Sequence, residues 1–525
     1  MRFFNTAGPV DDKRHYCLSP IDRFNLTEIA SLIDQEKYFV LHAPRQTGKT
    51  TCLLALMEYL NNTGKYCALY FNVESAQAAR GDVRQGMRAI LDELASSALY
   101  FLEDNFLEAH WEEILEKSGE YAAFGRILSL WAGESQLPVV LFIDEIDSLV
   151  DDTLISLLRQ LRTGYNKRPK QFPQSIVLCG VRDVRDYRIH SSKDKAIITG
   201  GSAFNIKAES LRLGNFSKED VVTLYRQHTD ETGQKFLPDV INTVWTLTSG
   251  QPWLVNALGY EVCFKMEEGH DRSRPITIKM IEQAKENIIL RRDTHIDQLA
   301  DKLQEERVRR VIEPILGGLK EPENIPTDDL LYAIDLGLVK VDKQLQIANR
   351  IYQEVIPREL TYSTQVTISE QTSWYVDSNG RLDMEKLLSS FQEFFREHSE
   401  SWVERFQYKE AGPQLLLQAF LQRIINGGGR VDREYGLGRK RTDLFLIWPY
   451  KEGVQKVVIE LKVLHTSLSD TINEGFKQTV GYMDICGANQ GHLVIFDRNK
   501  GRSWEERIFK RLEEYQGKKI TVWGM

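Results

Sequence analysis

The sequence predicts an α/β protein that consists of a doubly wound parallel sheet, a helical lid, a small mixed module and a second α/β domain. Three observations predict this fold class. Between residues 20 and 205, apolar strand runs alternate with amphipathic helical stretches, as a parallel sheet covered on both faces requires. Residues 215–290 carry helical periodicity only. From about residue 385 a second series of helix and strand patterns begins, and 525 residues suffice for three or four domains.

The composition is typical of a soluble globular protein, with 42% hydrophobic and 27% charged residues. No apolar run approaches the ~20 residues of a transmembrane helix, and the first residues lack the apolar core of a signal peptide. The six cysteines are scattered and form no Cys-x-x-Cys pair, which indicates thiols of a reducing cytoplasm and no structural zinc. We therefore expect a cytoplasmic protein without a membrane segment.

The charge is unevenly distributed along the chain. A net charge of −8 argues against a globally basic protein that binds nucleic acid. Residues 401–525, however, hold 20 basic and 15 acidic residues, a net charge of +5, so the first 400 residues carry −13. The C-terminal part is therefore the one that tolerates a polyanion.

A first motif lies between the apolar run Tyr38–Leu41 and the helical stretch 51–57. A strand, a tight loop ending in Gly-Lys-Thr and a helix are the layout of a P-loop, whose backbone N–H groups face anionic phosphates. We expect Lys49 to reach the β and γ oxygens and Thr50 to hold Mg²⁺. Ala43 stands where the pattern has glycine, and alanine resists positive φ. The candidate nucleotide-binding residues are Ala43, Pro44, Arg45, Gln46, Thr47, Gly48, Lys49, Thr50, Thr51 and Asp144.

Two carboxylates follow another apolar run. The run Leu137–Ile143 ends in Asp144 and Glu145, as a fully buried parallel strand would end at the ligand-binding edge of its sheet. We expect Asp144 to bind Mg²⁺, directly or through water. Glu145 is the candidate catalytic residue that polarises the water attacking the γ-phosphate.

Together these motifs resemble the AAA+/STAND-related group of archaeal-type P-loop ATPases over residues 1–360. The turn Thr248–Val255 is similar to the Gly-x-Pro turn of the helical lid in that group. The N-terminal Phe4–Pro9, with His15 and Tyr16, is similar to the segment that packs near adenine. The resemblance implies ATP and Mg²⁺ as cofactors and a protein that works as a homo-oligomer or as a nucleotide-gated switch.

Two roles implied by the resemblance stay open. The buried strand Ser175–Gly180 is followed by Arg182 and Asp183, at the position that senses the γ-phosphate in such sheets. A salt bridge unrelated to nucleotide fits these two residues equally well. The candidates for an arginine finger are Arg159, Arg162, Arg182 and Arg185.

Residues 311–360 combine short helices, a glycine turn and a short strand, and they resemble a winged helix-turn-helix. In the ATPase group this winged-helix-like module is more often an intramolecular packing surface than a reader of DNA. Residues 363–384 are polar and are expected to form a linker with little core.

A second constellation lies near the C-terminus. Asp443 falls in the strand pattern 441–448, and a turn at 451–453 leads to the strand 457–463. Alternation puts Glu460 and Lys462 on one face of that strand, and a hairpin can bring Asp443 beside them. Oxygen ligands of this kind suit Mg²⁺ or Mn²⁺, and a lysine can activate a metal-bound water for phosphodiester hydrolysis. The candidate metal ligands are Asp443, Glu460 and Leu461.

This constellation resembles the PD-(D/E)XK nuclease superfamily, a restriction-endonuclease-like fold, over about residues 385–525. Asp443, Glu460 and Lys462 stand at its signature positions, with Thr442 where the superfamily name has proline. Further catalytic candidates implied by the resemblance are Glu410, a helical acid that supports the metal, and Gln478 and Tyr482, a pair like that of the RecB-type branch. Arg439, Lys440 and Arg441 either contact phosphates or form a solvated turn.

The expected domains are a P-loop ATPase core at 1–210, a lid at 211–295, a winged-helix-like module at 296–362, a linker at 363–384 and a nuclease-like domain at 385–525. Our favoured hypothesis is an ATP-gated nuclease acting on nucleic acid, with DNA as the expected partner, in antiviral defence or mobile-element biology. One alternative is a nucleotide-dependent switch whose C-terminal domain only binds nucleic acid or a partner protein. Another is a repair or recombination motor, which the lack of a helicase motif set ranks last.

Overall fold

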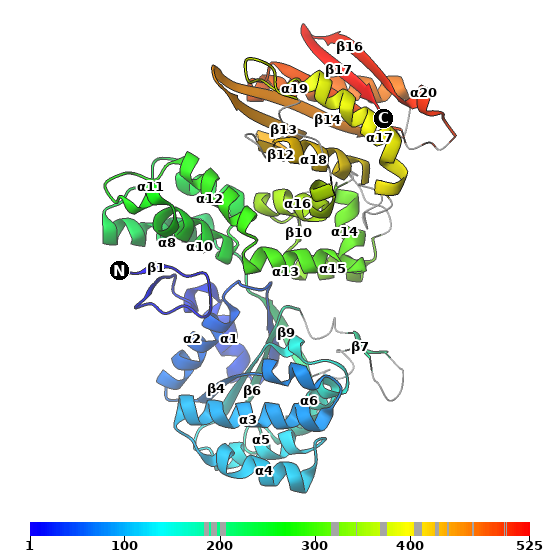
Figure 1. Ribbon diagram of the computed structural model, residues 1–525. Coiled ribbons are helices and arrows are strands. Elements are labelled where there is room, and N and C mark those ends of the chain that lie inside the picture. The colour runs from blue at the N-terminus through cyan, green and yellow to red at the C-terminus, as the bar shows by residue number, and fades with distance from the viewer. Residues whose placement is uncertain are drawn as a thin grey trace. The chain divides into compact units, whose positions relative to one another are not determined.

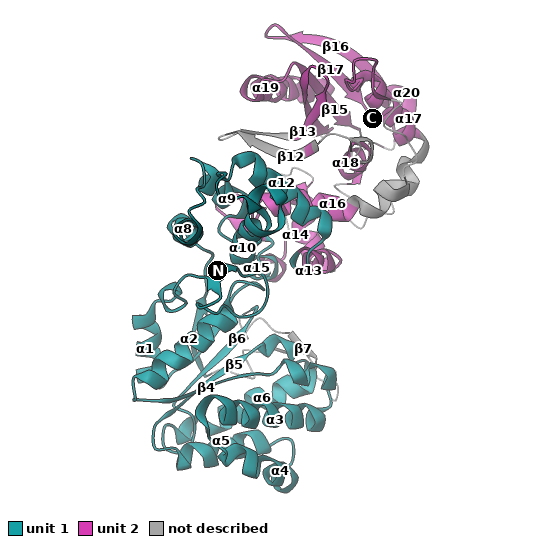
Figure 2. Cartoon of the chain, turned by 60° about the vertical axis from the view of Figure 1, so that its left-hand side comes forward, with its two compact units in different colours: residues 1–295, 331–338 teal, residues 296–330, 339–525 magenta. Residues whose placement is uncertain are grey.

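The structure is a computed structural model that describes most of the chain. The described residues are 1–182, 188–190, 197–199, 206–316, 325–342, 344–367, 375–403, 412–425, 430–437, 440–464, 467–497, 499 and 501–525. They divide into two compact units (Figure 2). Unit 1 comprises Met1–His295 and Leu331–Leu338, and unit 2 comprises Ile296–Leu330 and Val339–Met525.

A parallel sheet of five strands forms the centre of unit 1 (Figure 1). Its strands follow the order β4-β5-β6-β3-β9, and every neighbouring pair is parallel. This confirms the predicted parallel sheet and puts β6 between the strand of the first motif and the strand of the two carboxylates. The strands are β3 (Tyr38–His42), β4 (Cys67–Asn72), β5 (Val139–Asp144), β6 (Ser175–Gly180) and β9 (Lys207–Arg212).

Helices cover both faces of this sheet. Successive strand residues point to opposite faces, so Val140 and Phe142 pack against α1 and α2, whereas Leu141 and Ile143 pack against α3, α5 and α6. Both faces are therefore buried, which explains why the strands are continuously apolar. The helices are α1 (Leu26–Asp34), α2 (Lys49–Asn62), α3 (Val83–Leu102), α4 (Phe106–Ser118), α5 (Ala123–Glu134) and α6 (Asp151–Gly164). A separate pair of short strands is formed by β7 (Arg188–His190) and β8 (Ile197–Thr199).

Residues 215–290 are helical, as their periodicity predicts. The predicted turn is present at Ser249–Gln251, where Gly250 has φ +72°. A Cβ at Gly250 would lie 2.0 Å from the carbonyl oxygen of Phe216, so only glycine fits there. These helices are α8 (Lys218–Thr232), α9 (Val240–Thr248), α10 (Pro252–Tyr260), a π-helix (Glu261–Lys265), α11 (Glu267–His270) and α12 (Ile278–Arg291).

The N-terminal segment packs on these helices. Its strands β1 (Phe3–Phe4) and β2 (His15–Tyr16) pair in parallel. The ring of Phe4 lies 5.0 Å from the rings of Tyr16 and Tyr225, so it is fixed between β2 and α8. The segment between the two strands is thereby held beside the helical region.

The stretch 296–367 contains the helix, glycine turn and short strand that the sequence predicts, and a second short strand completes a hairpin. α15 ends at Asp335, Gly337 has φ +73°, and β10 pairs antiparallel with β11. The first residues of α13 and the last residues of α15 belong to unit 1. The elements of this stretch are α13 (Thr294–Leu303), α14 (Glu306–Leu316), α15 (Thr327–Asp335), β10 (Val339–Val341), β11 (Leu345–Ile347) and α16 (Arg350–Thr367).

A mixed sheet of six strands forms the second part of unit 2, in the order β12-β13-β14-β15-β17-β16. The first three strands are antiparallel, β14, β15 and β17 are parallel, and β16 returns antiparallel. The strands are β12 (Arg430–Leu437), β13 (Lys440–Tyr450), β14 (Gly453–Val463), β15 (Gln490–Phe496), β16 (Phe509–Tyr515) and β17 (Lys518–Gly524). The helices are α17 (Met384–Val403), α18 (Gly412–Ile425), α19 (Leu468–Cys486) and α20 (Trp504–Arg507).

The segment 363–384, expected to be a linker with little core, differs from that expectation. α16 continues to Thr367, and the described residues Tyr375, Leu382 and Met384 are buried. The backbone N–H of Leu382 donates to Gln455 Oε1 at 2.9 Å. The end of this segment is therefore part of the core beside the six-stranded sheet, because a few large apolar side chains are spaced among its polar residues. Within the described part of the chain, no helix is long and apolar enough to cross a membrane.

Candidate functional site

The loop after β3 has the backbone of a phosphate-binding turn. α2 begins at Lys49 with Gly48 as its N-cap at φ +89°, and Gln46 has φ +57°. Ala43 does not adopt positive φ, and its N–H donates to the carbonyl of Gly180 at 3.2 Å. The missing glycine at position 43 is therefore tolerated, since the left-handed positions of this loop are 46 and 48.

Lys49 is held across the loop. Its side chain is buried, and Nζ donates to the carbonyl oxygens of Ala43 at 3.0 Å and Pro44 at 3.3 Å. The hydroxyl of Thr47 also donates to Pro44, at 2.8 Å. The ammonium group thus lies at the mouth of the turn, where the backbone N–H groups at the start of α2 have no intrahelical partner.

The carboxylate of Asp144 is the centre of a hydrogen-bond network. Its side chain is fully buried, and Oδ2 accepts from Thr50 Oγ1 at 2.7 Å and from the hydroxyl of Tyr70 at 3.1 Å. Oδ1 accepts from the N–H of Glu145 at 2.9 Å. The two predicted Mg²⁺ ligands, Thr50 and Asp144, are therefore side by side. Their hydroxyl and carboxylate oxygens are donors that Mg²⁺ prefers.

Tyr70 is a residue of this network that the sequence does not predict. It lies on β4, two residues before the register partner of Asp144, which is Asn72. Burial raises the pKa of Tyr70 well above its usual range, and the charge of Asp144 raises it further, so the phenol stays a donor. The hydroxyl group of a tyrosine near the end of an apolar strand indicates a buried hydrogen bond. The residues around Tyr70 in the sequence do not indicate that Asp144 is its partner.

Glu145 sits directly beyond the strand at φ +55°. Burial raises the pKa of its carboxyl to about 7; Lys49 opposes the shift, and Asp147 and Asp144 add to it. A carboxyl that titrates near neutral pH is suited to act as a general base. Glu145 stays the predicted catalytic residue of this site, at the end of β5 beside Asp144.

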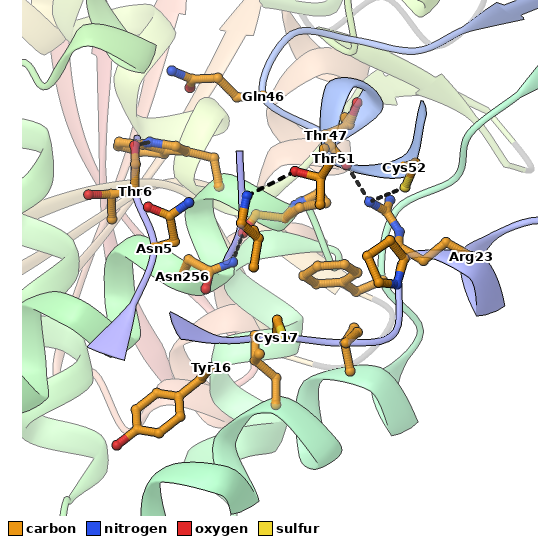
Figure 3. A pocket seen from close by; sticks show the side chains of 18 of the residues that line it. Asn5, Thr6, Tyr16, Cys17, Arg23, Gln46, Thr47, Thr51, Cys52 and Asn256 are labelled. Atoms are coloured by element: carbon orange, nitrogen blue, oxygen red, sulfur yellow. Dashed lines mark hydrogen bonds between the residues drawn. The ribbon is translucent and has the colours of Figure 1, made fainter. Parts of the chain in front are cut away.

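A cavity of about 140 Å³ opens beside the phosphate loop (Figure 3). The N-terminal segment closes one side, where the N–H of Val10 donates to Thr51 Oγ1 at 3.1 Å and Trp253 Nε1 donates to the carbonyl of Thr6 at 2.9 Å. The buried oxygens Gln46 Oε1 and Asn256 Oδ1 accept no hydrogen bond within the described residues. The lining comes from the N-terminal segment, the loop and the helical region, as in Asn5, Thr6, Gly8, Tyr16, Gln46, Gly48, Thr51, Phe216, Trp253 and Asn256.

Arg182 has a partner other than nucleotide. Its Nε lies 3.6 Å from Asp335 Oδ2, and its guanidinium lies 4.7 Å from the ring of Tyr332. Asp335 Oδ1 lies 3.9 Å from His42 Nδ1, at the end of β3. The salt bridge considered for this position is thus present. Asp183 and Arg185 lie outside the described residues, and Arg159 and Arg162 are exposed on α6.

In unit 2, Glu460 and Lys462 form a pair on β14. Glu460 is 3% exposed, and Lys462 Nζ donates to its Oε1 at 3.0 Å. Val458, on the same face by alternation, packs in the core formed with α19. Leu461 is buried on the opposite face of the strand. The predicted carboxylate and ammonium are therefore brought together beneath α19.

The other predicted residues of this constellation are only partly described. Gln478 and Tyr482 lie one turn apart on α19, and Gln478 Oε1 is buried and accepts no hydrogen bond within the described residues. Asp443 is a residue of β13, but its side chain, like those of Lys440 and Arg441, is outside the described set; Glu410 and Arg439 lie outside it entirely. Among the side chains that are described, no three His, Cys, Asp or Glu residues gather closely enough to hold a metal ion.

Comparison with known proteins gives a family match within unit 1. Residues 33–187 match the family model described as AAA domain. Among solved structures, the Walker-type ATPase paby2304 of Pyrococcus abyssi is 15% identical, covers 67% of this chain and 99% of its own, and gives a TM-score of 0.46. Cdc6p of Pyrobaculum aerophilum is 14% identical, covers 67% of this chain and 99% of its own, and gives a TM-score of 0.36. RuvB of Thermotoga maritima is 13% identical, covers 63% of this chain and 92% of its own, and gives a TM-score of 0.32. No curated protein matches the sequence.

The matched segment spans the phosphate loop, the strand with Asp144 and Glu145, and the strand before Arg182. It contains four of the five strands of the parallel sheet, β3 to β6, together with the phosphate loop, whereas β9 lies beyond it. Residues 33–187 are therefore similar to an AAA domain and have the parallel strands and the phosphate-binding turn of a P-loop fold.

Proposed function

We propose that this protein is an ATP-gated nuclease, in which the nucleotide state of the AAA domain controls Mg²⁺-dependent cleavage of phosphodiester bonds by unit 2. The observation that carries the proposal is the buried Glu460 paired with Lys462 on the hairpin strand β14. A buried acid beside an ammonium group, at the centre of a mixed sheet covered by a helix, is a costly arrangement for stability alone. We infer that catalysis explains it.

At the ATP site, the roles follow from the contacts. Lys49 would exchange the carbonyls of Ala43 and Pro44 for phosphate oxygens, and the loop N–H groups would bind the remaining phosphate charge. Thr50 and Asp144 would hold Mg²⁺, which would neutralise charge that develops on the phosphates. Glu145 would take a proton from the attacking water, because its carboxyl titrates near neutral pH.

At the nuclease site, support comes from the register of the hairpin. Leu444 pairs with Ile459 across β13 and β14, and one further step would set position 443 opposite position 460. Directly opposed residues of an antiparallel pair share a face of the sheet. Asp443, Glu460 and the Leu461 carbonyl would then hold Mg²⁺ or Mn²⁺, a Lewis acid for the phosphodiester. Lys462 would orient the attacking water, and Gln478 and Tyr482 would position the substrate.

The partner of the nuclease site is proposed to be DNA. The net charge of +5 over residues 401–525 tolerates a polyanion, and Arg439, Lys440 and Arg441 would contact its phosphates. We also propose that residues 211–295 form a lid over the nucleotide, residues 296–362 a winged-helix-like module, and the residues from 385 onward a nuclease-like domain. Assembly as a homo-oligomer in the cytoplasm and a role in antiviral defence belong to the same proposal.

A covalent path supports the gating. Residues Leu331–Leu338 belong to unit 1, where Asp335 meets His42 and Arg182. The packing is close, because a Cβ at Gly337 would lie 2.8 Å from the ring of Pro44 in the phosphate loop. The chain enters unit 2 again at Val339. A change at the phosphates would thus be felt by a segment that continues directly into unit 2.

The test is digestion of plasmid and oligonucleotide substrates with Mg²⁺, with and without ATP. We expect cleavage that depends on ATP and is lost in Lys462→Ala. Lys456→Ala is the matched control, since Lys456 lies on the same strand, is exposed and donates to the carbonyl of Cys486 at 3.1 Å. If the wild type cuts no DNA or RNA under any condition, and Lys462→Ala behaves identically, the nuclease proposal fails.

A second candidate function is a nucleotide-dependent switch whose unit 2 only binds nucleic acid or a partner protein. The salt bridge between Lys462 and Glu460 favours it, because an acid already paired with an ammonium needs no metal for charge balance. Calorimetry with Mn²⁺ separates the two functions. Heat of binding that disappears in Asp443→Asn supports the nuclease, and its absence in the wild type supports the switch.

A further inference from the structure

Arg23 is a charged residue of the nucleotide cavity to which no role has yet been given. It ends a short 3₁₀ helix, Ile21–Arg23, just before α1. Its Nη1 donates to the carbonyl oxygen of Thr47 in the phosphate loop, and its Nη2 donates to the carbonyl oxygen of Gly214 at 2.7 Å. The side chain enters the cavity wall beside Thr47 and Cys52 (Figure 3). One guanidinium therefore bridges two segments that are far apart in the sequence.

The contact with Thr47 fixes the orientation of a functional peptide. In a trans peptide the carbonyl and the next N–H point in opposite directions. Because Arg23 holds the carbonyl of Thr47, the N–H of Gly48 is turned away from Arg23, in the direction in which a P-loop offers N–H groups to phosphate. The approach is close, since a Cβ at Gly48 would lie 2.8 Å from Arg23 Nη1. Glycine is thus needed at position 48 for this contact as well as for its φ of +89°.

The contact with Gly214 lies where the chain leaves the sheet for the helical region. Leu213, just after β9, donates its N–H to the carbonyl of His42 at 3.0 Å, and α8 begins at Lys218. The ring of Phe216 lies 4.9 Å beneath the guanidinium of Arg23. The N–H of Phe216 donates to the carbonyl of Gly250 in the turn between α9 and α10, at 2.8 Å. Arg23 therefore touches the entrance of the helical region and, through Phe216, its central turn.

In the described part of the chain, no carboxylate lies within ion-pair distance of Arg23, and Asp220 on α8 acts on its charge only from farther away. Instead, two carbonyl oxygens accept hydrogen bonds from the guanidinium, and the face of an aromatic ring lies against it. A planar fork with fixed donors suits this task, whereas a lysine has a single ammonium that cannot serve both carbonyls and the ring in the same way.

We propose that Arg23 is a positioning residue that couples the phosphate loop to the helical region, so that nucleotide binding and ordering of that region depend on one another. Bound phosphate holds the peptide between Thr47 and Gly48, the fork of Arg23 transmits that fixed position to Gly214 and Phe216, and the helical region closes on the nucleotide. The inference rests on the nucleotide site proposed above.

The test compares Arg23→Lys with Arg168→Lys in the full-length protein. Arg168 is a matched control at the amino ends of the strands, away from the phosphate loop. Like Arg23, it donates to two backbone carbonyls, those of Tyr165 and Glu36, and lies on aromatic rings, those of Tyr165 and Tyr38. Binding of ADP and of Mg²⁺–ATP is measured by calorimetry, and hydrogen exchange of peptides from 43–60 and 213–232 is measured with and without saturating ADP.

For Arg23→Lys we expect affinity weakened about tenfold, the scale of one lost charge-assisted hydrogen bond. At saturating ADP, protection of 43–60 should remain while protection of 213–232 is largely lost. Arg168→Lys should bind and protect like the wild type. If the wild type binds no nucleotide, the site and this inference fall together. If the wild type binds but Arg23→Lys protects both regions fully, this inference alone is overturned.

A second variant covers the case in which Arg23→Lys unfolds. Phe216→Leu removes the ring beneath the guanidinium and leaves the contact with Thr47 in place. At saturating ADP we expect protection of 43–60 to remain and protection of 213–232 to be reduced, because only the helical half of the bridge is weakened. Unchanged protection in Phe216→Leu would contradict the coupling.

Discussion

The two candidate sites differ in how their acids are balanced. Asp144 accepts hydrogen bonds from two hydroxyl groups and one backbone N–H, and no salt bridge reaches it within the described residues. Glu460 is buried to nearly the same extent but already has the ammonium of Lys462 at 3.0 Å. Among the described residues, the carboxyl group of Asp144 therefore has only neutral hydrogen-bond donors around it, whereas the carboxyl group of Glu460 has a cationic one. Of the two proposed metal sites, as far as their residues are described, only the one on β14 includes a counter-charge from the protein itself.

The sites also differ in how much of the chain they require. Lys49 and Thr50 come from one turn between a strand and a helix, and Asp144 comes from a strand two places away in the same sheet. The proposed nuclease site needs residues from a helix, two strands and a further helix. A site made within one turn forms with the local fold, whereas a site assembled from several segments depends on the register of the whole sheet.

The largest effect is expected from Lys49→Ala, which also tests whether the two sites are linked. Loss of the ammonium group should lower ATP hydrolysis about 100-fold or more, because a preorganised charge on the phosphates is removed. If the sites are coupled, ATP-dependent DNA cleavage should fall with it. Phosphate release and plasmid digestion measure the two activities on one preparation.

Lys65→Ala, at an exposed position after α2, should leave both activities unchanged. Lys462→Ala should abolish cleavage and leave ATP hydrolysis intact. Full ATP-dependent cleavage by Lys49→Ala would break the proposed link and leave two independent sites.

Glu145→Gln tests the acid–base chemistry that distinguishes the ATP site. With a pKa of about 7 in the folded protein, Glu145 is protonated below neutral pH, so hydrolysis by the wild type should rise as pH increases through 7 and level off above it. Glu145→Gln should lower the rate of hydrolysis about 100-fold and abolish its rise with pH, while ATP still binds. The measurement is kcat between pH 5.5 and 9. A variant that keeps the same rise with pH would show that another group titrates.

The same shift predicts a change in stability. Because burial raises the folded-state pKa of Glu145 above its ordinary value of 4.5, the folded state binds its proton more tightly than the unfolded chain. The free energy of unfolding should therefore fall as pH rises from 4.5 to 7. Glu145→Gln lacks this term, so nucleotide-free Glu145→Gln should gain stability relative to the wild type at pH 8 but not at pH 4.5. Equal differences at both pH values in thermal melts would contradict the shift.

Tyr70→Phe sharpens the comparison of the two acids. The variant removes one of the two hydroxyl groups on Asp144 Oδ2 and keeps the ring, so the carboxylate loses part of its orientation. Outer partners of metal ligands typically affect metal affinity about tenfold or more, and we expect the Mg²⁺ concentration for half-maximal hydrolysis to rise about tenfold. Tyr59→Phe, exposed on α2, is the control. An unchanged Mg²⁺ requirement would show that Thr50 alone orients Asp144.

Sequence patterns predict the strands and the chemical groups that stand at their ends. The run Leu137–Ile143 and the hairpin strands are found where the apolar patterns place them, because continuous burial and alternation depend on nearby residues. Tyr70 and Arg23 could not be predicted, since their partners Asp144 and Gly214 lie 74 and 191 residues away. The linker expected at 363–384 was wrong at its end for a related reason. The polar composition of this segment predicts exposed residues, but Tyr375 and Leu382 are buried because the segment packs beside a sheet that is distant in the sequence.

The smallest effect is expected from Trp253→Phe at the cavity. Trp253 is 8% exposed, and its Nε1 donates to the carbonyl of Thr6 at 2.9 Å. The loss of one neutral hydrogen bond costs about 1 kcal/mol, so the N-terminal segment would be held less firmly and ADP affinity should fall about threefold to fivefold. Calorimetry with ADP measures the change, and Trp245→Phe, at a partly exposed position on α9, is the control. A loss as large as that of Lys49→Ala would mean that the cavity wall, rather than the phosphate loop, dominates nucleotide binding.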